Sequence, residues 1–203
     1  MVYHTAGPGI VTPDDFLHHP AANDRTELVR GHIQVMTPAS AAHGLVSGTV
    51  FHLLASHVRQ HKLGACFADS TGYTLPNLPN TVRAPDASFV RRERLPANGV
   101  GAGFLEMAPD LAVEVLSPNE SREDIAAKLA DYRVAGTPLV WVIDPAARTV
   151  TVISATEDDA TVGESQRLSG GSTLPGFTCS VRDLFEGLAA PLTPPSTLPT
   201  AQG

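Results

Sequence analysis

Apolar residues recur at helical spacing in two long stretches of the chain. Residues 43–61 place apolar side chains every three or four positions, which is the spacing of one helix face, and Gly64 is expected to end the run. Residues 121–135 predict a second helix, which opens on a capping box and stops at Gly136. A short helix is expected over residues 12–19.

The remaining apolar runs predict strands. Two of them flank Arg30 and Gly31 and form a hairpin with a tight turn. The run 109–116 is typical of a strand that is buried on both faces. A surface hairpin with loops is expected over 155–176. Further strands are expected at 66–69, 72–75, 83–90, 139–144 and 149–153, and a last short helix at 181–185.

Length and composition indicate an ordinary globular chain. With 203 residues, of which 42% are hydrophobic and 17% charged, we expect a single domain over residues 1–190. The Pro/Thr/Ser-rich stretch 191–203 is expected to be a disordered tail. No apolar run is long enough for a membrane span, and the N-terminus carries no secretory pattern, so a cytoplasmic location is expected.

The formal net charge of −7 argues against a broad basic face for nucleic acid, because such binding depends on Lys and Arg. Local patches matter more than the total, however, and residues 83–94 contain four arginines. These arginines are more simply explained as the solvated end of a strand and its loop.

Two acidic residues stand in or beside apolar strands, where carboxylates are unusual. Glu114 lies inside the run 109–116, and burial there costs several kcal/mol unless the carboxylate is paired or binds a metal. Asp86 follows a proline and precedes the apolar Phe89 and Val90. Carboxylates on neighbouring strands can share a divalent ion, and such hard oxygen ligands suit Mg²⁺. A structural salt bridge is the alternative for Glu114.

A lysine would complete such a site, since an ammonium can orient a metal-activated water or offset charge in the transition state. Lys128 is the candidate, because it shares a helix face with Ile125 and Tyr132 and can point toward the sheet. The alternative is an exposed ion pair with Asp124, four residues earlier.

The histidines and the other eye-catching side chains have simpler explanations. His57 and His61 are four residues apart but lack an HExxH pattern, so no zinc site is expected. His43 is expected to begin its helix, with a smaller chance of reaching the site. Tyr132 and Trp141 are expected in the core, where Tyr132 could border the site.

A series of motifs in order resembles a known family. Pro85-Asp86, the run from Pro109 to Pro118, then Asp124, Lys128, Tyr132, Gly136 and residues 141–145 look like the Uma-type putative restriction endonucleases, within the PD-(D/E)XK nuclease superfamily. The resemblance covers residues 12–185 and includes the opening hairpin. It implies an α/β (α+β) fold of the restriction-endonuclease type, in which helices flank a mixed β-sheet.

The resemblance also implies roles for individual residues. Asp86 and Glu114 would be the metal ligands, and Glu27 would support the metal water from the opening hairpin. The superfamily pattern places a lysine two positions after the second acid, but this chain has Leu116 there. The lysine role would therefore have moved to Lys128 on the following helix.

Three functions remain open on these grounds. The first is an endonuclease that uses Mg²⁺ or Mn²⁺ to hydrolyse DNA phosphodiester bonds at Asp86, Glu114 and Lys128, for which a homodimer would suit cleavage of both strands. The second is a catalytically inactive module of the same fold that binds nucleic acid or a protein partner. The third is a metallohydrolase acting on other substrates, because one fold hosts many functions.

Overall fold

The computed structural model describes residues 3–4, 9–20, 25–36, 38–118 and 120–189. Its α-helices are α1 (Pro13–Leu17), α2 (Ala41–His61) and α3 (Arg122–Ala135), and short 3-10 helices cover Arg92–Arg94 and Val181–Phe185. The expected tail 191–203 lies outside the described residues. Among these residues no helix is both long enough and apolar enough to span a membrane.

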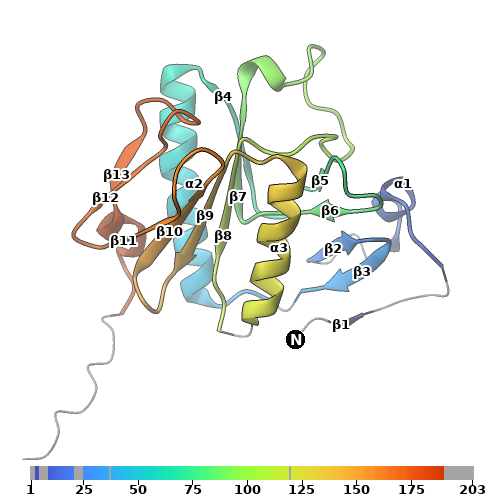
Figure 1. The fold of residues 1–203 in the computed structure, drawn as a ribbon, viewed down its shortest axis with the longest axis horizontal. Coiled ribbons are helices and arrows are strands. Elements are labelled where there is room, and N and C mark those ends of the chain that lie inside the picture. The colour runs from blue at the N-terminus through green and yellow to red at the C-terminus, as the bar shows by residue number, and fades with distance from the viewer. Residues whose placement is uncertain (1–2, 5–8, 21–24, 37, 119, 190–203) are drawn as a thin grey trace, which may run out of the picture.

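A six-stranded mixed sheet forms the centre of the fold (Figure 1). Its strands, in spatial order, are β11 (Ala160–Gly163), β10 (Thr149–Ser154), β9 (Leu139–Asp144), β8 (Leu111–Val115), β7 (Ala87–Arg91) and β4 (Gly64–Ala68). Only β8 and β9 pair in parallel, and α3 makes the crossover between them. Helix α2 covers one face of the sheet and α3 the other.

A second sheet lies beside the first and carries the opening hairpin. Its order is β1 (Tyr3–His4), β3 (His32–Val35), β2 (Thr26–Val29), β6 (Val82–Arg83) and β5 (Tyr73–Thr74). The turn between β2 and β3 has positive φ at both Arg30 and Gly31, as a tight two-residue hairpin turn requires. A small ribbon pairs β12 (Arg167–Ser169) with β13 (Thr178–Ser180).

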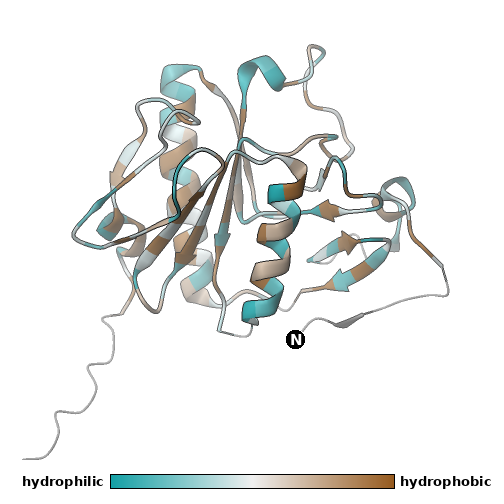
Figure 2. Ribbon diagram, viewed as in Figure 1, coloured by the Kyte–Doolittle hydropathy of each residue, from teal (hydrophilic) through white to brown (hydrophobic). Residues whose placement is uncertain are grey.

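Hydrophobic side chains fill both faces of the large sheet. On one face, α2 and the C-terminal segment enclose a core that includes Phe89, Leu111 and the fully buried Trp141. On the opposite face, Tyr132 of α3 packs with Ala112 and other residues. Figure 2 shows the hydrophobic colour concentrated along the central strands, between the more hydrophilic outer elements. The sheet is thus buried on both sides, as the apolar run around Glu114 predicts.

Both caps of the two long helices follow from local chemistry. Helix α3 begins with a capping box between Ser121 and Asp124 and ends at Gly136, whose φ of 82° suits glycine. Helix α2 ends at His61, as predicted, but its cap is Lys62, which takes the left-handed conformation with φ 54°, and not Gly64. Gly64 instead opens β4.

Two expectations for the strands are corrected. Residues 83–90 are not one strand: β6 belongs to the small sheet and β7 to the large one, and the link 84–86 carries the chain between them. The segment 155–176 is not confined to the surface, because Leu168 and Leu174 are fully buried in the core beneath α2. The predicted class, helices flanking a mixed sheet, is confirmed.

Glycines at two positions should respond to alanine with opposite signs. Gly48 lies within α2 with open space around its missing Cβ, so Gly48→Ala should raise the free energy of unfolding by about 0.5 to 1 kcal/mol. At Gly64 a Cβ would collide with the Val90 carbonyl oxygen, so Gly64→Ala should destabilise the protein. Urea denaturation of both variants measures these effects, and a destabilised Gly48→Ala protein would contradict the placement of Gly48.

Candidate active site

Strand pairing brings Asp86 and Glu114 together. Ala87 of β7 lies opposite Val113 of β8 in an antiparallel ladder, and the Asp86 amide donates to the Val113 carbonyl at 2.9 Å. Asp86 therefore stands at the end of β7, level with Glu114 on the neighbouring strand. Both carboxylates are almost fully buried. The two acids predicted from the sequence are neighbours in the fold.

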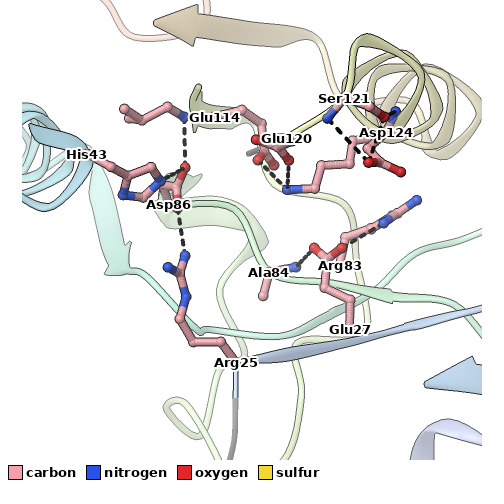
Figure 3. Close-up of polar contacts among 12 residues, drawn as sticks. Arg25, Glu27, His43, Arg83, Ala84, Asp86, Glu114, Glu120, Ser121 and Asp124 are labelled. Atoms are coloured by element: carbon pink, nitrogen blue, oxygen red, sulfur yellow. Dashed lines mark hydrogen bonds and ion pairs between the residues drawn. The ribbon is translucent and has the colours of Figure 1, made fainter. Parts of the chain in front are cut away.

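Three donors surround the Asp86 carboxylate (Figure 3). Its Oδ2 accepts a hydrogen bond from the Val115 amide at 2.7 Å and lies 3.1 Å from Nε2 of His43, at the start of α2. Its Oδ1 lies 3.4 Å from Nη2 of Arg25, just before β2. The pKa of His43 is raised: burial alone would lower it, but the hydrogen bond and the charge of Asp86 outweigh that effect. His43 thus borders the site.

Helix α3 supplies the partners of Glu114. Lys128 Nζ donates to Oε2 at 2.9 Å and the Tyr132 hydroxyl donates to Oε1 at 2.7 Å. The two residues are one helical turn apart, so a single face of α3 delivers both. Burial raises the pKa of Glu114 to about 7, although the Lys128 ammonium acts against it, and the charges of Asp86 and Glu27 add to the rise.

Lys128 points into the protein and not to solvent. Besides Glu114, its ammonium lies 3.2 Å from Oε1 of Glu120, and these carboxylates raise the pKa of Lys128 above its usual value although burial acts to lower it. The Asp124 carboxylate instead accepts a hydrogen bond from the Ser121 hydroxyl in the helix cap, and the Asp124 amide donates to the same hydroxyl. The alternative of an exposed Asp124–Lys128 pair is therefore wrong, and the expected orientation of Lys128 toward the sheet is confirmed.

Glu27 lies at the same site but within a second charge network. Its Oε2 accepts from Arg83 Nη1 at 2.6 Å and its Oε1 from the Ala84 amide at 3.0 Å. Burial would raise the pKa of Glu27, but the charges of Lys128 and Arg83, together with these hydrogen bonds, hold it below the usual value. Arg83 also binds Asp131 of α3 through Nε and Nη2, at 2.9 and 2.6 Å. This network ties the hairpin to α3.

A cavity of about 240 Å³ opens beside these groups. One wall is the hairpin β2–β3, which contributes Glu27, Val29 and Val35, and another is α3, which contributes Lys128. Asp86 also lines the cavity, whereas Glu114 is not among its lining residues but is bonded to Lys128, which is. The cavity can admit a small group, such as a phosphate with an ion, to Asp86 and Lys128.

The donor set can hold a divalent cation in part. Within the described ranges no group of three His, Cys, Asp or Glu side chains gathers as metal ligands. The neighbouring buried carboxylates of Asp86 and Glu114 nevertheless suit a cation that takes hard oxygen ligands. Mg²⁺ commonly draws one or two carboxylates from a protein and the rest of its shell from water and phosphate. The residues present thus fit a magnesium-type ion.

Sequence reasoning missed the two arginines of the site. Arg83 belongs neither to a basic patch nor to a solvated strand end, because it is buried between Glu27 and Asp131. Its partners lie 56 and 48 residues away along the chain, so no local pattern announces them. Arg25 and the contact of His43 with Asp86 are also long-range. The only local signal was the position of His43 at the start of a helix.

The chain resembles known proteins in both sequence and fold. A family model, Uma2, described as "Putative restriction endonuclease", matches residues 13–182. The crystal structure of a putative nuclease belonging to DUF820 from Anabaena variabilis ATCC 29413 superimposes with a TM-score of 0.75 at 24% sequence identity, and the match covers 86% of this chain and 97% of that one. No curated protein matches the chain.

Loss of the Glu27 charge should weaken the protein in a pH-dependent way. Glu27→Gln should lower the free energy of unfolding by about 3 kcal/mol at neutral pH, because buried Arg83 loses one of its carboxylates. The folded pKa of Glu27 lies below its ordinary value of 4.5, so its stabilising effect is present above that pH and is lost as the pH falls through the folded value. Urea denaturation at neutral pH and at about pH 3 should show the difference from the unchanged protein shrinking in acid. A difference independent of pH would contradict this role.

Proposed function

The chain belongs to the Uma2 family of putative restriction endonucleases, and we propose that it is a metal-dependent nuclease that hydrolyses phosphodiester bonds in DNA. The observation that carries the proposal is the pair of buried carboxylates, Asp86 and Glu114. They lie side by side, Asp86 directly before β7 and Glu114 on β8, with the Lys128 ammonium bonded to Glu114. Family membership supports the same class of reaction.

Asp86 and Glu114 would hold the ion, Mg²⁺ or Mn²⁺. When bound, the ion supplies a polarised phosphoryl oxygen and a water of lowered pKa for in-line attack. The Val115 amide and His43 fix the orientation of Asp86, and the Tyr132 hydroxyl fixes that of Glu114. These contacts support the proposal because metal ligands bind best when other groups hold them in place.

Lys128 would act on the reacting phosphate. Its ammonium is bonded to Glu114 and lines the cavity, so it can orient the attacking water or offset the charge that develops on the phosphoryl oxygens. Glu27, on the opposite wall, would support the metal water from the hairpin while it holds Arg83.

DNA as substrate and a homodimer as the working form are parts of the same proposal. A two-fold dimer would present one site to each strand of a duplex. The competing proposal is a catalytically inactive module that binds nucleic acid or a protein, which the net charge of −7 and Leu116 favour. Metal binding and DNA nicking separate the two.

Removal of one ligand should abolish both metal binding and cleavage. Asp86→Asn keeps the side-chain shape but removes the charge, so Mn²⁺ affinity measured by calorimetry and plasmid nicking should each fall by more than about 100-fold. Asp144→Asn is the matched control, since Asp144 accepts hydrogen bonds in a turn away from the cavity. Nicking that persists in a well-folded Asp86→Asn protein would contradict the assignment.

Removal of the lysine should separate binding from chemistry. Lys128→Met takes away the ammonium but leaves both carboxylates, so the protein should still bind Mn²⁺ while plasmid nicking falls by about 100-fold or more. Calorimetry and the nicking assay measure the two effects on the same preparation. Unchanged nicking would remove Lys128 from the reaction.

A further inference from the structure

Four cations line the cavity within the described part of the chain, and three are held firmly by carboxylates. Arg83 binds Glu27 and Asp131 at 2.6 Å each, Arg30 binds Asp131 at 2.9 Å, and Lys128 binds Glu114 at 2.9 Å. Withdrawing Arg83 or Lys128 would leave a buried carboxylate, Glu27 or Glu114, without its bonded cation. Arg83 and Lys128 therefore cannot turn to a substrate at low cost. Arg30 is 60% exposed, but its ion pair is with Asp131, which it shares with Arg83, and not with a proposed metal ligand.

Arg25 is the fourth cation and is held differently. Its Nη2 lies 3.4 Å from Oδ1 of Asp86 and 3.4 Å from Oδ2 of Asp69, which follows the end of β4. Both separations exceed those of a good charged hydrogen bond. The side chain is 29% exposed and that of Asp69 is 40% exposed. Figure 3 shows the Arg25 guanidinium directed at Asp86. Arg25 is thus shared between an inner and an outer carboxylate and is fixed tightly by neither.

The inner partner of Arg25 is also a proposed metal ligand. A divalent cation at Asp86 and the Arg25 guanidinium would neutralise the same carboxylate, so each weakens the hold of the other by the reciprocity of linked binding. A metal ion would therefore release Arg25 from Asp86. Asp69 would keep the guanidinium at the cavity wall after release.

We propose that Arg25 binds the phosphate of the nucleic-acid substrate, and that metal binding at Asp86 frees it to do so. The inference rests on the proposed nuclease function and adds the residue that recognises the phosphodiester. A planar guanidinium can donate two parallel hydrogen bonds to a phosphate, which suits a substrate chosen for its backbone. The metal and Arg25 would then hold the same phosphate group from two sides.

The proposal predicts effects of opposite sign on two ligands. Arg25→Gln removes the competitor of the metal, so Mn²⁺ affinity measured by calorimetry should rise by about two- to five-fold, as expected for a partly exposed ion pair. The same variant loses the phosphate contact, so affinity for a fluorescein-labelled DNA duplex, measured in Ca²⁺ to hold the substrate without cleavage, should fall by about tenfold.

Arg59→Gln is the matched control. Arg59 is exposed near the end of α2, so the substitution changes the net charge equally without touching the cavity. It should leave Mn²⁺ affinity unchanged and alter DNA affinity far less than Arg25→Gln. Thermal melting of both variants checks that they fold.

Asp69→Asn supplies an independent test through the outer partner. With Asp69 neutral, Arg25 has only Asp86 as carboxylate partner, so Mn²⁺ affinity should fall by about two- to five-fold. The effect should vanish in the Arg25→Gln background, because it acts through Arg25, and a double-mutant cycle measures that coupling.

The outcomes distinguish a failure of the Arg25 proposal from a failure of the nuclease proposal. If the unchanged protein binds Mn²⁺ and DNA but Arg25→Gln behaves like Arg59→Gln, or weakens Mn²⁺ binding, the role of Arg25 is overturned and the nuclease site stands. If the unchanged protein binds no Mn²⁺, the nuclease proposal fails and the role of Arg25 fails with it. A rise in Mn²⁺ affinity together with a fall in DNA affinity, seen in Arg25→Gln and not in Arg59→Gln, supports both the nuclease proposal and the role of Arg25.

Discussion

The ion pair between Glu114 and Lys128 is the contact on which the rest of the site depends. A carboxylate in the middle of a strand buried on both faces needs a cation and a hydrogen-bond donor, and α3 delivers both from positions one turn apart. The pair therefore fixes how α3 lies over the sheet as well as its distance from it. Since α3 joins the two parallel strands β8 and β9, this docking also helps to fix their pairing at the centre of the sheet.

The charge network around Arg83 attaches the small sheet to α3, as the ion pair of Lys128 attaches the large sheet to the same helix. Arg83 joins Glu27 of β2 to Asp131 of α3, and Arg30 in the hairpin turn is a second arginine bonded to Asp131. The hairpin is held opposite the helix at a separation set by side-chain lengths. The cavity lies between them, so the charge network helps to position two of its walls.

The sequence predicted those parts of the fold and site that depend on local pattern. The double-sided burial around Glu114, the hairpin at Arg30 and Gly31, and the inward face of α3 all follow from spacing that a single segment displays. The split of 83–90 between two sheets could not be read in this way, because only tertiary pairing assigns Arg83 to one sheet and Ala87 to the other. Arg83 was misjudged for a related reason: its partners are distant in sequence, and an arginine by itself favours solvent.

In the proposed site the lysine comes from a helix and not from the strand that carries Glu114, and this changes what keeps the site assembled. Position 116 is free to join the hydrophobic cluster on that face, where Leu116 packs, but the ammonium now arrives on a 14-residue element with its own tendency to fray. Local opening of α3 would part the lysine from the carboxylates while the strands stayed paired. The fraction of molecules with a complete site is therefore set by how well one helix stays docked, and ligands that bridge the helix and the sheet would protect its amides from hydrogen exchange.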